Sequence, residues 1–203
     1  MTSLGQGLGD QFGDVTITGD VEIDGALTVP GVLTLVETIT IAGSAVTNSD
    51  FTTTLDGDND AEYVIKAHII NPLGSQVTYT PRINGAAWAG TRQHAIFYGT
   101  AGSSINTTNN TSVLTLDDTG QVPDEGDLVL YIDHPLSGVS VERLARFESS
   151  SADVTANQPD SIYIGRFYYT TPSSGTNITS LGIQSDTASG IGIGSVLKLF
   201  RMT

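Results

Sequence analysis

The first quarter of the chain carries a hydrophobic pattern that repeats every six residues. Residues 13–48 divide into the units GDVTIT, GDVEID, GALTVP, GVLTLV, ETITIA and GSAVTN. Glycine opens five of the six units, and Glu37 takes its place in the fifth. The third and fifth positions of the first five units are apolar, and the residue between them is Thr or Glu. Each unit therefore predicts one short strand with two apolar side chains on one face and a turn at the glycine.

The apolar positions of this repeat form the predicted core of a stem made by three chains. A hexapeptide helix of one chain uses three units for each coil, so six units give about two coils, fewer than the ~3 stacked repeats such folds need. Three chains wound around one axis would bury these side chains and leave no free strand edge. The predicted stem core is Val15, Ile17, Val21, Ile23, Leu27, Val29, Leu33, Leu35, Ile39 and Ile41. Ordinary hairpin strands packed on the rest of the chain are the alternative interpretation.

The rest of the chain consists of short strand-like runs separated by turn residues. Branched side chains suit a pleated sheet, and Gly, Asn and Asp favour turns. The runs are residues 62–70, 76–83, 93–99, 112–116, 128–133, 139–147, 161–170, 177–184 and 195–202. The best helical spacing lies at residues 141–148, and an edge strand fits that segment nearly as well. We therefore predict an all-β protein: an N-terminal arm (1–12), a trimeric β-helix or β-prism stem (13–48) and a jelly-roll-like β-sandwich head (49–203).

Charge and composition exclude several classes of binding partner and site. The 203 residues include 22 acidic and 8 basic ones, a formal net charge of −14, and the basic residues are scattered. A phosphate backbone requires clustered cations, so we expect no nucleic acid partner. No apolar run approaches the ~18–20 residues of a membrane span, and residues 1–14 lack the pattern of a secretory signal. The absence of cysteine excludes disulfides and Cys-ligated zinc.

Residues with catalytic potential do not form a recognisable motif. The three histidines show no metal-ligand spacing, and the chain has no H-E-x-x-H, G-x-S-x-G or P-loop lysine motif. We expect no enzymatic activity, although the many carboxylates keep glycoside hydrolysis open as a remote alternative.

One acidic run is a candidate calcium site. Asp56, Asp58, Asp60 and Glu62 alternate along a short loop, and calcium takes six to eight oxygen ligands. The run departs from an EF-hand, because Ala61 and Ala67 stand where that loop requires Gly and Glu. A solvated acidic turn is the competing interpretation, and no other cofactor is predicted.

Aromatic residues are the candidates for sugar binding. Trp88, in a predicted loop, and Tyr98 have flat faces that suit stacking on a sugar ring. Aromatic side chains of a β-sandwich more often belong to the core, which is the competing interpretation for both.

Several segments after the glycine repeat follow a pattern of short strands and tight turns: LDG (55–57), DAEYVI (60–65), IIN (69–71), YTPRING (79–85) and GIGIGSVLKLFR (190–201). With the repeat before them, these segments resemble the sandwich domains of tailed-bacteriophage fibre, spike and head-decoration proteins. The resemblance implies a homotrimer on the virion surface, and it transfers no site residues, because these families share none.

Two functions follow from the resemblance. In the first, the chain is a homotrimeric capsid decoration or head-fibre protein, bound to a capsid or tail protein through residues 1–12. In the second, it is a tail-associated receptor-binding fibre whose head grips a host-surface polysaccharide. The short chain and the small arm favour the first.

Overall fold

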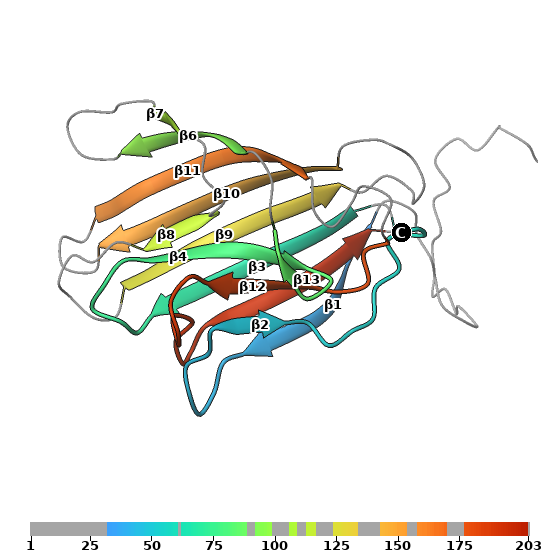
Figure 1. The fold of residues 1–203 in the computed structure, drawn as a ribbon, viewed down its shortest axis with the longest axis horizontal. Helices are drawn as coiled ribbons and strands as arrows, with labels where there is room; N and C mark the ends of the chain where they lie inside the picture. The colour runs from blue at the N-terminus through green and yellow to red at the C-terminus, as the bar shows by residue number, and fades with distance from the viewer. Residues whose placement is uncertain are drawn as a thin grey trace, which may run out of the picture.

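The structure, a computed structural model, describes residues 32–60, 62–88, 92–98, 106–108, 113–116, 124–133, 143–153, 158–169 and 177–202. Its strands form two antiparallel sheets, the smaller lying across one face of the larger (Figure 1). The eight-stranded sheet has the order β1 (Leu33–Thr40), β13 (Val196–Met202), β3 (Glu62–Asn71), β9 (Asp124–Asp133), β10 (Arg143–Asp153), β11 (Gln158–Tyr169), β6 (Arg92–Tyr98) and β7 (Asn106–Thr108). The smaller sheet has the order β2 (Asn48–Asp50), β12 (Leu181–Ser185), β4 (Val77–Ile83) and β5 (Ala86–Ala87), and β8 (Leu114–Leu116) also pairs with β4.

The predicted all-β class is confirmed. Each of the nine strands expected after residue 48 has a counterpart in these sheets. The segment with helical spacing is β10, which lies between β9 and β11 and is therefore not an edge strand. Among the described residues, no helix is long and apolar enough to cross a membrane. The prism stem and the jelly-roll connectivity stay predictions, and residues 1–31 lie outside the described residues.

One hydrophobic core fills the space between the two sheets. Its side chains come from alternate positions of the strands, as β4 illustrates with Val77, Tyr79 and Ile83 buried and the residues between them half-buried. Two buried hydroxyls have partners in the core region: Tyr63 donates to Asp60 at 2.7 Å and Tyr79 donates to the carbonyl of Gly190 at 2.8 Å. Burial raises the pKa of both tyrosines, and the neighbouring carboxylates raise it further.

The repeat runs directly into the sandwich. Strand β1, which the sequence pattern assigns to the stem, pairs with β13 along its whole length. A bulge between Leu35 and Glu37 inserts one extra residue. Leu33 and Leu35 before the bulge therefore point to one face of the sheet, and Ile39 after it points to the other. Leu33 and Leu35 lie opposite Met202 and Phe200 on the outer face, 43% and 52% exposed.

The bulge corrects the prediction for two stem residues. Ile39 lies opposite the core residue Leu197 and packs against the core, and Ile41 is buried within it. Both are thus shielded by their own chain instead of by a shared stem. The other six predicted stem positions, Val15, Ile17, Val21, Ile23, Leu27 and Val29, lie outside the described residues.

Glu37, the residue that interrupts the glycine pattern, holds β1 in place. Its carboxylate accepts hydrogen bonds from the backbone N–H groups of Thr52 and Thr53, at 3.0 and 2.9 Å, and from the Thr52 hydroxyl at 2.9 Å. Burial alone would raise the pKa of Glu37, but these bonds outweigh it and hold the pKa below its usual value. The glycine pattern of the repeat is thus interrupted at Glu37, the residue that links β1 to the sandwich.

Candidate functional site

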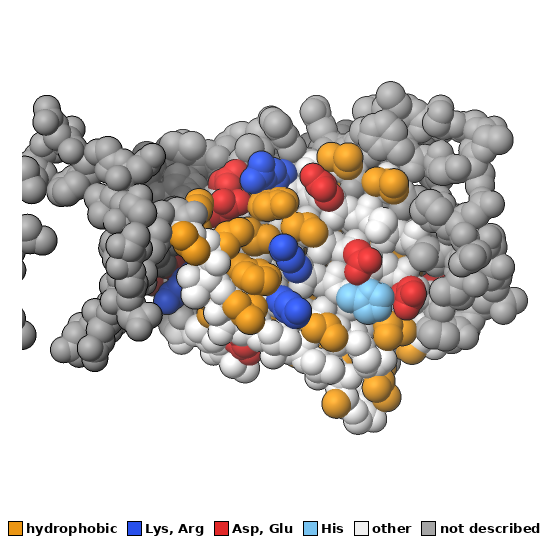
Figure 2. Space-filling view, turned by 180° about the vertical axis from the view of Figure 1, so that it is seen from behind, with side chains coloured by type: hydrophobic (Ala, Val, Ile, Leu, Met, Phe, Trp, Pro, Cys, Tyr) orange, Lys and Arg blue, Asp and Glu red, His pale blue; other side chains and the backbone are white. Residues whose placement is uncertain are grey.

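The outer face of the eight-stranded sheet combines apolar, aromatic and basic side chains. Pairing registers place Leu35, Phe200, Val64 and Tyr131 in one row across β1, β13, β3 and β9. Val64 is fully buried, yet it lies on this face and not among the core side chains between the sheets. Figure 2 shows hydrophobic side chains gathered here with Lys and Arg among them. A surface of this kind is typical of an interaction site.

Both lysines of the chain lie on this face. Lys66 and Lys198 are direct cross-strand partners in the β3–β13 ladder. Like charges placed opposite each other destabilise a sheet unless something compensates them. Lys66 lies over the ring of Phe200, with its Nζ 5.4 Å from the centroid, which compensates one of the two charges in part. In a chain of net charge −14, this pair is a local site of attraction for carboxylates.

Arginine adds to the same face. The Arg146 guanidinium lies 4.2 Å from the ring centroid of Tyr131 and 3.6 Å from the Glu62 carboxylate. The ring and the carboxylate together fix the direction of this side chain over β9.

An acidic group with one histidine occupies another part of the face. The Nδ1 atom of His68 lies 3.1 Å from the Asp127 carboxylate, and its Nε2 lies 3.5 Å from that of Glu125. The three side chains come from neighbouring strands β3 and β9 and are largely exposed. Figure 2 shows the histidine flanked by acidic side chains, apart from most of the hydrophobic ones. The face therefore has regions of opposite charge.

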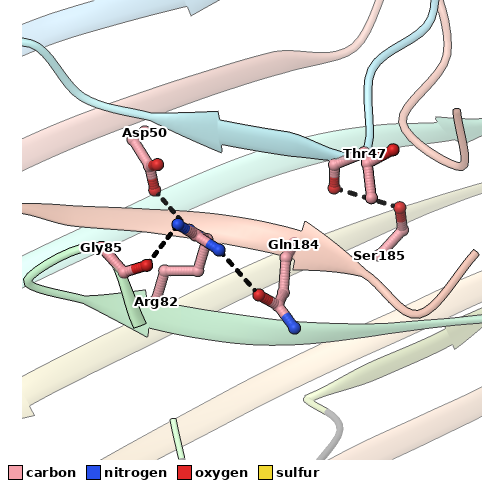
Figure 3. Close-up of polar contacts among 6 residues, drawn as sticks. All are labelled: Thr47, Asp50, Arg82, Gly85, Gln184 and Ser185. Atoms are coloured by element: carbon pink, nitrogen blue, oxygen red, sulfur yellow. Dashed lines mark hydrogen bonds and ion pairs between the residues drawn. The ribbon is translucent and has the colours of Figure 1, made fainter. Parts of the chain in front are cut away.

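The outer face of the smaller sheet holds a separate polar network (Figure 3). The Nε atom of Arg82 on β4 donates to Asp50 Oδ1 on β2 at 2.8 Å, across the intervening strand β12. The same guanidinium donates to Gln184 at 2.9 Å and to the carbonyl of Gly85. Ser185, also drawn there, donates from its hydroxyl to the Thr47 carbonyl at 3.1 Å.

A glycine makes the bridge across β12 possible. Gly182 pairs with Asp50 on one side and with Arg82 on the other. A Cβ at this position would overlap the Asp50 carboxylate and lie 2.6 Å from the Ser49 carbonyl oxygen. The network thus fastens the three-residue strand β2 to the rest of the sheet, which is a structural role.

The predicted calcium ligands are directed to different partners. Asp56 accepts bonds from the backbone of Asp58 at 3.2 Å and from the Asn177 amide at 3.1 Å, which closes the loop. Asp60 is buried with Tyr63, and Glu62 begins β3 on the outer face, near Arg146. Within the described part of the chain, no three His, Cys, Asp or Glu residues are grouped so as to hold a metal ion. Calcium binding therefore gains no geometric support here.

The predicted sugar-stacking residues have different outcomes. Trp88 is only 3% exposed and belongs to the hydrophobic core, so its ring face is not presented to a ligand. Its backbone N–H donates to the Pro81 carbonyl at 2.8 Å, which turns the chain inward after the β4–β5 hairpin. The prediction that Trp88 stacks on sugars is corrected accordingly. Tyr98 ends β6, and its side chain lies outside the described residues.

Sequence reasoning missed the outer-face group, although part of its signal is visible in the sequence. Lysine occurs twice in the whole chain, and Lys198 is followed two positions later by Phe200. Residues two apart in a strand share a face, but the β3–β13 register that joins Lys66 to them follows from the fold alone.

Comparison with known proteins finds no family model that matches the chain and no curated protein that matches it.

Proposed function

We propose that the protein is a non-enzymatic structural component of a tailed-bacteriophage virion. Three copies join through the repeat of residues 13–31, residues 1–12 attach the trimer to a capsid or tail protein, and the sandwich projects from the particle surface. A capsid decoration or head-fibre protein of this kind needs an assembly surface and a soluble head, and it needs no reaction centre.

The observation that carries the proposal is the point where the repeat meets the sandwich. Leu33 and Leu35 occupy apolar positions of the fourth repeat unit and are about half exposed on β1. Among the described strands, β1 pairs with β13 alone and is therefore a sheet edge. Proteins cover such edges or blunt them with charge, because an open apolar edge aggregates. Three chains joined through the repeat would cover this edge.

The net charge of −14 fits a projecting head. Acidic surfaces keep neighbouring copies soluble and apart except where a specific contact is built. The receptor-binding alternative has less support, since Trp88, one of the two aromatic side chains that the sequence offered for sugar stacking, is buried.

Localisation on purified particles tests the proposal. We expect antibodies raised against the sandwich to label the capsid surface at regular positions. Labelling at the tail tip would favour the receptor-binding fibre instead. Absence of the protein from intact, purified particles would overturn both.

A further inference from the structure

We propose that the sandwiches of neighbouring copies contact one another through the outer face of the eight-stranded sheet, with strand β1 of one copy packing on strand β11 of the next. This inference rests on the proposed homotrimer and identifies the surface through which its heads meet.

Among the described side chains of this face, the large exposed apolar ones lie on two strands that are far apart. Leu33 and Leu35 lie on the edge strand β1, and Ile162 and Ile164, 42% and 47% exposed, lie on β11, the sixth strand of the sheet. Four strands separate β1 from β11, a distance of about 24 Å at ~4.8 Å per strand. One chain cannot bring these two strands together. A threefold assembly does so, because its contacts join two different patches of identical copies.

Charges on the face match the same arrangement. Lys198 lies on β13 next to β1, and Glu148 on β10 is the direct cross-strand partner of Ile164 on β11. Packing β1 of one copy on β11 of the next brings a lysine of one copy toward a carboxylate of its neighbour, while the leucines meet the isoleucines. This attraction relieves the repulsion between Lys66 and Lys198 within each copy, which the Phe200 ring compensates only in part.

The bulge in β1 gives the face its continuity with the repeat. Because it turns Leu33 and Leu35 outward, two side chains from the apolar positions of the repeat lie on the same surface as Phe200 and Met202. The contact between repeats would thus extend without a gap into a contact between sandwiches.

The area of the face limits how much it can contribute to the contact between copies. Its eight strands hold between eight and nine residues each on average and cover roughly 1,100 Å², somewhat more than the ~800 Å² that one partner buries in a stable interface. In a ring of three, each copy divides this face between two neighbours. The face therefore adds to the contact made by the repeats and does not replace it.

A cross-linking experiment on the full chain tests this contact. The chain has no cysteine, so the double variant Leu35→Cys, Ile164→Cys introduces a single pair. The ~24 Å between the two strands prevents a bond within one chain. After mild oxidation we expect covalent dimers and trimers on a non-reducing denaturing gel. The matched control, Leu35→Cys with Thr80→Cys on the smaller sheet, should stay monomeric on that gel.

A charge exchange provides a second measurement that does not depend on cysteines. Lys198→Glu places a carboxylate opposite Glu148 of the neighbour and should weaken the trimer. We expect the variant to begin to dissociate at a protein concentration about tenfold higher than that of the wild type. Adding Glu148→Lys should restore the wild-type value. Glu148→Lys alone should weaken association as Lys198→Glu does.

The outcomes separate this inference from the proposed function. The full chain could be trimeric by mass but show no more cross-linking than the control and no rescue by the charge exchange. That result would agree with the homotrimer and would overturn the proposal that this face forms its contact. A monomeric full chain removes the homotrimer itself. Binding of polygalacturonate that is abolished by Lys198→Glu, without any cross-link, would overturn the inference in favour of an acidic polysaccharide as occupant.

Discussion

Gly182 on β12 lies between Asp50 on β2 and Arg82 on β4, whose side chains form an ion pair across it. Replacing Gly182 with alanine tests how much this ion pair contributes to holding β2 in the smaller sheet. The added methyl group would overlap the Asp50 carboxylate and lie 2.6 Å from the Ser49 carbonyl oxygen and 2.8 Å from the Asp50 Cα. Backbone atoms cannot yield as a flexible side chain does. The strand β2 must therefore shift away from β12, and the 2.8 Å ion pair with Arg82 is lost.

The expected loss follows from three contributions. Overpacking costs about 1–3 kcal/mol, and a hydrogen bond to a charged group contributes ~1.5–3 kcal/mol. The Arg82 side chain is 14% exposed but that of Asp50 is 39% exposed, so solvent screening places the ion pair at the low end. Alanine also restricts the unfolded chain, which offsets ~0.4–1 kcal/mol. We expect the free energy of unfolding to fall by about 2 kcal/mol.

Urea unfolding at one fixed protein concentration measures this loss. Trp88 is the single tryptophan of the chain and is buried in the core, so its fluorescence reports the transition. In an Asp50→Ala background, the overlap with the carboxylate is gone, and Gly182→Ala should be milder. A loss below about 0.5 kcal/mol, or an equal loss in both backgrounds, would refute crowding of Asp50 as the cause.

Two further predictions follow from the contacts of the sandwich. The stabilisation by Glu37 is present above the usual carboxyl pKa and is lost as pH falls through its lowered folded-state pKa. Glu37→Gln should therefore reduce the free energy of unfolding by about 1 kcal/mol at neutral pH. In urea titrations, this difference from wild type should disappear as the pH is lowered. A difference that does not depend on pH would contradict the prediction. Trp88→Ala should lower the free energy of unfolding by ~3–5 kcal/mol as a core truncation, measured by circular dichroism, and a variant of wild-type stability would show that the ring does not support the core.

The strands were predictable because their signal is local. In β4, every second side chain is apolar or aromatic enough to be buried, and the glycine turn after Asn84 marks its end. The segment that became β10 was ambiguous, since a short run with Val141, Ala145 and Phe147 fits two periodicities. Pairing with β9 and β11 decided between them, which is tertiary information.

The repeat shows where a regular pattern misleads. Its apolar positions continue in period through Leu35 and Ile39 in the sequence, yet the bulge places these two side chains on opposite faces. The one visible signal was Glu37 in a glycine position, and its meaning depends on Thr52 and Thr53, which lie far along the chain.

The candidate sites depended on contacts between distant residues. Trp88 stands among small residues typical of a loop, but the chain turns it into the core. The link between Asp50 and Arg82 also requires Gly182 from a third strand, a combination that no spacing in the sequence announces.

The mass of the purified full chain in solution tests the central claim most directly. Light scattering should give about 64 kDa, three chains of 21.2 kDa. Leu27→Asp, at an apolar position of the repeat, should shift the mass toward the monomer, whereas the neighbouring Thr28→Asp should leave it unchanged. A wild-type chain that is folded and has the mass of one copy at all concentrations would contradict the account.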